Sequence, residues 1–169
     1  FDYFLSQSEM ISTLFVALND EVFEIREAAV QVLGRLTLRN PAHVMPKMRN
    51  MLVQLLTALE FGAEGSREQS ARLFGHVILA CHHLIKPYVA PVLEAVLLNL
   101  RDPNPNVAAN VLKTIGVLSR VGASEVLKRR DEIFPLVIEA LQDQSSSMKR
   151  EVSLRTLGVL VQSTGYVIG

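Results

Sequence analysis

The chain has 169 residues, of which 49% are apolar, and its 17 basic and 17 acidic side chains give a formal net charge of zero. A neutral balance argues against a dedicated nucleic-acid or membrane-surface binder, because both rely on an excess of positive charge. The single cysteine, Cys81, cannot form an internal disulfide, and no run of residues is apolar and long enough to predict a membrane span. We therefore expect protein partners, no nucleic acid and no direct membrane insertion.

Four glycines recur at near-equal spacing along the chain: Gly34, Gly75, Gly116 and Gly158. An apolar residue precedes each glycine, another follows two positions later, and a leucine stands at a matching position upstream in the preceding helix. A period in the low forties with such matched positions is typical of a helical solenoid. The predicted fold is all-α, an α-solenoid of about four antiparallel helix hairpins. The predicted hairpins lie at about residues 8–40, 42–83, 84–121 and 125–164, within one segment that spans residues 1–169.

In the first hairpin, an apolar stripe through Leu14 and Leu18 predicts a leading helix. Asn19-Asp20 should end that helix and cap the next one, because a short side-chain oxygen satisfies free amides of the first turn. Asn40-Pro41 should end the second helix, since the residue before a proline disfavours helical geometry.

In the second hairpin we expect Pro46 in the first turn of the leading helix, where a missing amide hydrogen costs little. A loop is predicted at residues 61–65, with Ser66 as the N-cap of the next helix. In the third hairpin, two prolines make residues 101–106 a stiff turn. The fourth is predicted as one helix at 125–141 and a final helix that begins at Met148.

Acidic and basic residues also recur beside the turn inside each hairpin. The expected pairs are Asp20 with Arg26, Glu64 with Arg67 and Asp143 with Arg150, whereas Ala108 stands at the arginine position of the third repeat. A charge ladder between stacked turns is the favoured interpretation, because guanidinium groups pair with both carboxylates and carbonyls. A helical glycine costs about 1 kcal/mol against alanine, so the repeated glycines indicate close approach of a neighbouring helix. The predicted structural repeat positions are therefore Asp20, Arg26, Gly34, Arg67, Gly75, Asp102, Gly116, Asp143, Arg150 and Gly158.

The sequence offers one place to look for a metal or a nucleophile, Cys81-His82-His83. Adjacent helical residues point about 100° apart, so these side chains cannot converge on one ion unless the helix unwinds. No positioned base or electropositive setting for Cys81 is evident. We predict no catalytic, cofactor-binding or metal-binding residue in this chain.

The period, the Asp/Arg placement and the recurring Leu-Gly-x-Leu resemble HEAT repeats. Two longer strings are more specific, and both are similar to the N-terminal helical solenoid of the target of rapamycin (TOR) kinases. They are LFVALNDEVFEIREAAVQVLGRLTLRNPAHVMP at residues 14–46 and KREVSLRTLGVLVQSTGYV at 149–167. REQSARLFGH at residues 67–76 lies between them in the right order, so the resemblance spans nearly the whole chain.

This resemblance implies that the chain is a non-catalytic segment of a large serine/threonine protein kinase of the phosphatidylinositol-3-kinase-related group. The kinase domain, with its ATP and Mg²⁺, would lie far downstream of these residues. The family also implies a role in nutrient and growth signalling as part of TOR complex 1, in the cytoplasm and, through the complex, at endomembranes. The implied partners are neighbouring HEAT repeats and a Raptor-like regulatory subunit.

Two alternatives stay open at this point. A nuclear transport receptor is also built of HEAT pairs, although such receptors commonly carry acidic inner surfaces and this chain is neutral. A self-contained enzyme using Cys81 and the neighbouring histidines is the other. We further expect the chain to be part of a longer solenoid that continues after residues 165–169, because apolar residues stand at both of its ends.

Overall fold

The computed structural model describes residues 2–165, with side chains from residue 7 onward, and in this part of the chain the only regular secondary structure is helical, without a strand. The all-α prediction is confirmed. The α-helices are α1 (Asp2–Ala17), α2 (Phe23–Arg39), α3 (Pro41–Phe61), α4 (Glu64–Ala80), α5 (Val89–Val96), α6 (Pro105–Val121), α7 (Ala123–Lys128), α8 (Arg130–Leu141) and α9 (Ser147–Thr164). Short 3₁₀ helices are η1 (His82–Leu84), η2 (Lys86–Tyr88) and η3 (Leu97–Arg101). The expected start of a further repeat after Gly165, and the side chains of the apolar residues at both ends of the chain, lie outside the part that the structure describes.

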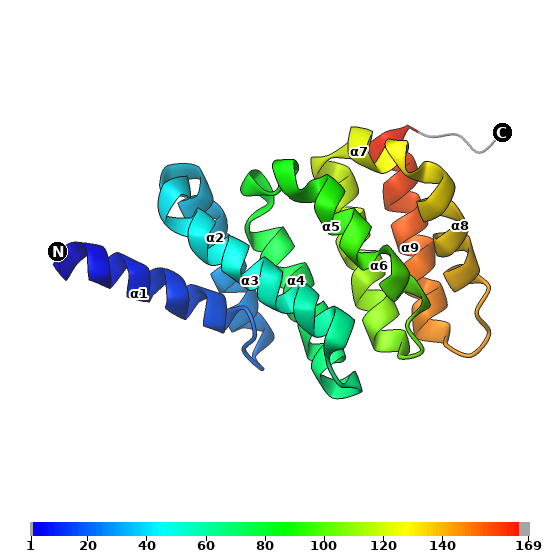
Figure 1. Ribbon diagram of the computed structural model, residues 1–169, viewed down its shortest axis with the longest axis horizontal. Helices are drawn as coiled ribbons and strands as arrows, with labels where there is room; N and C mark the ends of the chain where they lie inside the picture. The colour runs from blue at the N-terminus through cyan, green and yellow to red at the C-terminus, as the bar shows by residue number, and fades with distance from the viewer. Residues whose placement is uncertain (1, 166–169) are drawn as a thin grey trace.

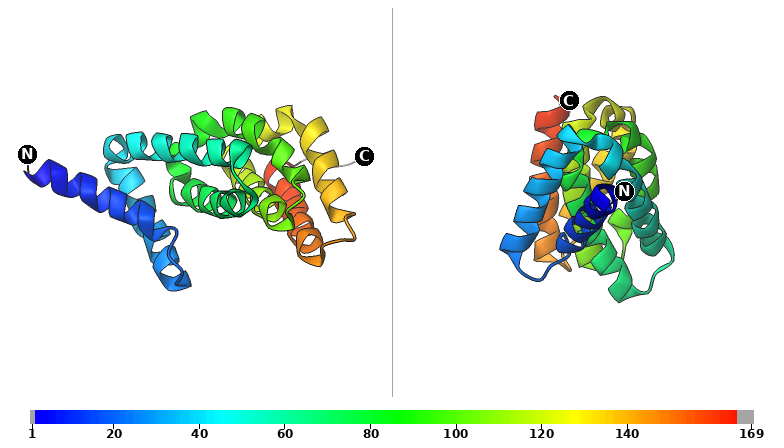
Figure 2. Two further views of the ribbon diagram at one scale, coloured as in Figure 1. Left: turned by 60° about the horizontal axis from the view of Figure 1, so that its bottom comes forward. Right: turned by 90° about the vertical axis from the view of Figure 1, so that its left-hand side faces the viewer.

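The helices form two layers that run along the length of the molecule (Figure 1). In one layer, α2, α4, α6 and α9 pack each against the next. In the other, α1 contacts α3, α3 contacts α5, and α8 packs against η3, which continues α5. Figure 2 shows both layers side-on, with α1 projecting beyond the rest of the stack. This arrangement is an α-solenoid, as predicted from the spacing of the glycines.

The core follows the same period as the sequence, which explains why the pattern could be recognised. The residue before each of the first three glycines is almost fully buried: Leu33, Phe74 and Ile115. The matching leucine at the end of the leading segment is also buried in the first three repeats, at Leu18, Leu59 and Leu100. Each repeat therefore supplies equivalent apolar side chains to one continuous core between the two layers.

Two expectations at the second hairpin were wrong. The leading helix α3 begins at Pro41 itself, in the first-turn position where proline is well tolerated, so Pro46 lies inside the helix and not at its start. Helix α4 begins at Glu64 after the N-cap Ala63, so Ser66 is a helical residue rather than the cap. The loop between the two helices is correspondingly shorter than predicted.

The leading segments of the last two repeats are also less regular than expected. In the third, residues 86–101 form η2, α5 and η3 instead of one continuous helix, and Pro87 lies within η2. In the fourth, the predicted helix at 125–141 is interrupted at Arg129 between α7 and α8. The interruption places the Arg129 guanidinium 3.1 Å from a carboxylate oxygen of Glu94 in α5 and 2.9 Å from one of Glu132.

The four repeated glycines do not share one packing role. A Cβ atom at Gly75 would lie 3.0 Å from Thr114 Oγ1, which is closer than side chains normally pack. At Gly34 and Gly116 the nearest atoms outside their own helices would be 3.7 and 3.6 Å away, an ordinary contact, and at Gly158 nothing lies within 4 Å. Close approach of a neighbouring helix therefore accounts for the glycine at Gly75, but not for the one at Gly158.

These distances predict opposite responses to the same substitution. Gly158→Ala should raise the free energy of unfolding by up to about 1 kcal/mol, because alanine favours a helix and meets no neighbour. Gly75→Ala should not raise the free energy of unfolding, because Thr114 must move to admit a methyl group and the cost of that movement offsets the helix preference of alanine. Urea unfolding followed by circular dichroism tests the pair. Equal stabilisation by both substitutions would contradict the packing described here.

Candidate interaction surfaces

Asp20, Asp102 and Asp143 lie in turns between paired helices, and all three make the same local hydrogen bond. Each carboxylate accepts a hydrogen bond from the backbone N–H two residues later, the local bond by which aspartate stabilises a turn. The acceptor–donor distances are 2.8 Å to Val22 N, 2.9 Å to Asn104 N and 2.9 Å to Ser145 N, respectively. Each aspartate therefore stabilises the turn in which it lies.

The arginines of the first and fourth repeats bind the same turns through the backbone. Arg26 Nη1 donates to the carbonyl oxygen of Asp20 at 2.7 Å, and Arg150 Nη1 donates to that of Asp143 at 2.9 Å. The Asp143 carboxylate accepts instead from Lys149 Nζ at 2.9 Å. Hydrogen bonds from Ser145 and Lys149 hold the pKa of Asp143 well below its usual range. The predicted ion pairs of Asp20 with Arg26 and of Asp143 with Arg150 are therefore wrong. Each arginine instead donates to a backbone carbonyl oxygen of its own turn.

A link between adjacent repeats occurs at Arg67. Its guanidinium makes a bidentate contact with Asp102 of the next repeat, with Nε 3.0 Å from Oδ2 and Nη2 3.2 Å from Oδ1. The predicted ion pair between Arg67 and Glu64 is not formed. Ala108 leaves the third repeat without a turn arginine of its own, and Arg67 supplies the cation from the second repeat. Both side chains are mostly buried, 21% and 7% exposed, so this pair is part of the interface between the repeats.

Asn104 strengthens the same junction and was not identified from the sequence. Its side chain is buried; the amide nitrogen donates to Glu64 at 3.2 Å and to Glu68 at 3.0 Å, both in α4. Its oxygen accepts from the backbone N–H of Asn106 at 2.8 Å and so caps α6. The only sequence signal was the Asn-Pro step at a helix start, which predicts the cap but not the contacts with α4.

His76 joins α4 to the turn that follows α1. Its Nδ1 lies 3.0 Å from the carbonyl oxygen of Leu18. Burial lowers the pKa of His76 below its ordinary value, and the positive charges of Arg26, Arg72 and Lys113 lower it further. The folded protein therefore favours the neutral imidazole.

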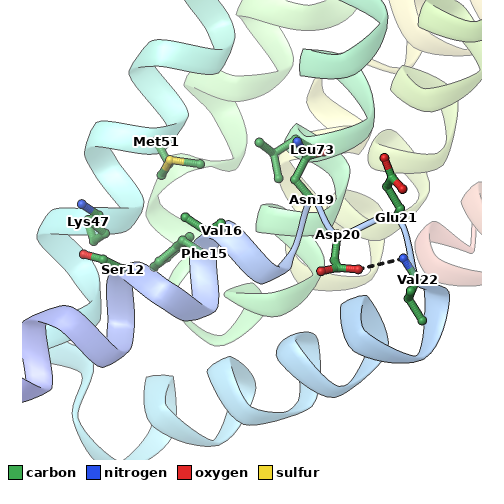
Figure 3. A pocket seen from close by; sticks show the side chains of 10 residues that line it. All are labelled: Ser12, Phe15, Val16, Asn19, Asp20, Glu21, Val22, Lys47, Met51 and Leu73. Carbon is green, nitrogen blue, oxygen red and sulfur yellow. Dashed lines mark hydrogen bonds between the residues drawn. The ribbon is translucent and has the colours of Figure 1, made fainter.

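An open groove of about 670 Å³ lies beside the first turn, between α1 and α3 (Figure 3). Phe15, Val16, Met51 and Leu73 give it an apolar lining, and the Val16 side chain is 74% exposed. Lys47 extends from α3 at one side, while Asp20 and Glu21 stand in the turn at the other. Such a groove can receive an apolar side chain from another protein, but its lining carries no catalytic grouping.

The candidate metal and nucleophile positions are not brought together. Cys81 is fully buried, and burial raises its pKa to about 12, so its thiol stays protonated at neutral pH. His82 and His83 follow it in η1. Among the side chains that the structure describes, those of residues 7–165, no three histidine, cysteine or carboxylate groups are placed so that they could hold a metal ion. In the same range, no helix combines the length and apolar character that crossing a membrane requires.

Comparison with known proteins identifies the family to which this chain belongs. The model of the family described as "Dynein axonemal assembly factor 5-like, TPR repeats" matches residues 3–167. The chain belongs to this family of helical repeats. Its glycine spacing, in the low forties, is longer than the period of a tetratricopeptide repeat and falls in the range of HEAT repeats.

Among individual proteins, the chain is similar to serine/threonine-protein kinases named TOR. It is 47% identical over 174 residues to the serine/threonine-protein kinase TOR of Oryza sativa subsp. japonica and 45% identical over 174 residues to that of Arabidopsis thaliana. It is 42% identical over 170 residues to the serine/threonine-protein kinase TOR2 of Saccharomyces cerevisiae. These alignments cover 99–100% of the chain but only 7% of each kinase. The resemblance to TOR kinases is confirmed, and the matching part is a repeat segment.

The Arg67–Asp102 contact predicts how the second and third repeats are held together. Asp102→Ala should lower the free energy of unfolding by about 1–3 kcal/mol, because it removes hydrogen bonds to a charged group. Adding Arg67→Ala should cost less than Arg67→Ala costs in the wild type, since the contact with Asp102 is already lost and only the bond to the Gly62 carbonyl oxygen remains to be broken. Urea unfolding of the single and double variants measures this. Strictly additive losses, or an equal loss in the exposed control Glu60→Ala, would contradict a shared contact.

The lowered pKa of His76 predicts a pH dependence of stability. Because the folded state binds this proton less readily than the unfolded state, the contribution is complete above the unfolded pKa and is lost as the pH falls through the folded pKa. Between about pH 7.5 and about pH 5.5, the wild type should therefore lose more stability than His76→Gln. Thermal melts across this range measure the difference. A parallel loss in both proteins would overturn the assignment.

Proposed function

We propose that this chain is a non-catalytic scaffold segment of a TOR-type serine/threonine protein kinase. In this role it supports assembly of a TOR complex and binding of a Raptor-like regulatory subunit in growth and nutrient signalling. The observation that carries the proposal is the 42–47% identity to three TOR kinases over essentially the whole chain. Any ATP and Mg²⁺ would be bound by the kinase domain of the parent protein, and the segment would act in the cytoplasm or, with its complex, at endomembranes.

The architecture supports a scaffold role. Stacked helix pairs expose an extended surface on each layer, and solenoids commonly bind proteins through such surfaces. Several large apolar side chains are exposed on the layer that contains α1, α3 and η3, among them Val16, Val53 and Leu98, which are 65–79% exposed. Leu38 and Leu154, on α2 and α9 of the other layer, are 64% and 59% exposed. These positions allow each layer to be tested without disturbing the core.

The test uses the full-length kinase that carries this segment, with one layer altered at a time. Variant sets Val16→Glu/Val53→Glu/Leu98→Glu and Leu38→Glu/Leu154→Glu are compared with the wild type. We expect one set to reduce co-purification of the regulatory subunit at least tenfold, because burying a carboxylate in an apolar interface is costly. Phosphorylation of a short peptide substrate should stay within about twofold, since the segment takes no part in the chemistry.

Two results would contradict the proposal. Full retention of the regulatory subunit by both sets would argue against a binding role for this segment. A loss of peptide phosphorylation that matches the loss of subunit binding, in kinase shown to be folded, would argue against a non-catalytic role.

A further inference from the structure

Exposed cations recur along the layer of second helices with the period of the repeats. Arg72, Lys113 and Arg155 keep the spacing of the repeated glycines, because each stands three positions before one of them. Residues three apart lie on the same side of a helix, so the three cations occupy equivalent places on α4, α6 and α9. These helices pack side by side in that order (Figure 1). Gln31 occupies the equivalent position in α2, so the series of cations is confined to these three helices.

Three cations line a groove between α6 and α9. This groove has a volume of about 290 Å³ and is lined by Lys113 and Arg120 of α6 and by Arg155 of α9. Val117, Val152 and Val159 give it an apolar floor. We call Arg72, Lys113, Arg120 and Arg155 the basic stripe.

Three of the four cations of the basic stripe form no ion pair with the carboxylates that the structure describes. Arg72, Lys113 and Arg120 take part in none of the ion pairs found among the described residues. Arg155 pairs only with Glu151, one helical turn away on the exposed surface, where such pairs are weak. Glu68 in α4 accepts instead from Asn104 at 3.0 Å. A chain with no net charge thus carries a local excess of positive charge on one face.

We propose that the basic stripe binds an acidic, extended segment of a partner protein. Packed helices are about 8–10 Å apart, which sets the separation of equivalent cations on neighbouring helices. A polyproline II segment has three residues per turn and rises about 3.1 Å per residue, so every third side chain returns to one face after about 9 Å. Acidic residues at every third position therefore match the repeat-spaced cations Arg72, Lys113 and Arg155, and intervening prolines can contact the valines of the groove.

This inference goes beyond the proposed function, because it names a surface and a partner chemistry that do not depend on a Raptor-like subunit. The cation spacing and the open groove carry it, whereas the identity to TOR kinases does not enter. Loss of subunit binding and loss of acidic-peptide binding can therefore be scored separately.

The experiment measures binding of a labelled peptide to the full-length protein that contains this chain. The probe is a fluorescent peptide of roughly fifteen residues with glutamate at every third position and proline between, and its control carries glutamine instead of glutamate. We expect the glutamate peptide to bind at least tenfold more tightly than the glutamine peptide by fluorescence anisotropy. Its binding should weaken between about 50 and about 300 mM salt, since exposed charges are screened.

Variants then test whether the stripe is the site. Lys113→Glu/Arg120→Glu should weaken glutamate-peptide binding at least tenfold, whereas Arg39→Glu/Lys86→Glu, which changes the net charge equally at two exposed cations elsewhere, should leave it within about twofold. Equal binding by both variants would overturn the proposal, as would no preference for glutamate over glutamine. Stripe-dependent binding to phosphatidylcholine vesicles containing phosphatidylserine, without peptide binding, would also overturn it and indicate a membrane ligand.

Discussion

The structure depends on the packing of each second helix against the next one. Helix α6 has neighbours on both sides, α4 and α9, and its apolar side chains, including Leu112 and Ile115, are fully buried between them and the first-helix layer. Each pair buries its apolar face mainly against the pairs beside it, so the stack has no single centre. This arrangement leaves two long surfaces exposed to solvent, and the groove beside the first turn is open, so it does not hold a substrate away from water. A role in binding other proteins follows more readily from it than catalysis.

Polar contacts at the turns help to set the register between neighbouring helix pairs, in a stack that is held together mainly by apolar contacts. Aspartates stabilise the turns of the first, third and fourth repeats locally, and arginines in the first and fourth repeats bind the turn carbonyls. Between the second and third repeats, Arg67 contacts Asp102, and the third repeat has Ala108 in place of a turn arginine of its own. Polar contacts of this kind favour one register between neighbouring pairs, since a shifted stack would leave buried charged groups without partners. The relative orientation of repeats, and so the shape of any binding surface, is set partly here.

The sequence was sufficient to predict the fold class and the repeat period, because buried positions such as Leu33, Phe74 and Ile115 recur with the glycines. Contacts between repeats were harder to predict. Glu64 is only three residues from Arg67, yet Arg67 pairs with Asp102, and local spacing carries no information about which distant turn lies alongside. The 3₁₀ segments around α5 and the interruption at Arg129 were missed because their apolar pattern is compatible with one continuous helix. The basic stripe was also missed, since a net charge of zero conceals how charges are distributed over the surface.

Amide hydrogen exchange of a polypeptide limited to these 169 residues tests the central claim most directly, because it reports stability helix by helix. If each pair is stabilised by its neighbours, α6, flanked by α4 and α9, should exchange slowest. Protection should fall toward α1, which has neighbours on one side only among the described helices. Uniform protection across all helices, or an α1 that exchanges more slowly than α6, would show that the chain folds around a single shared centre and would contradict the neighbour-by-neighbour stack.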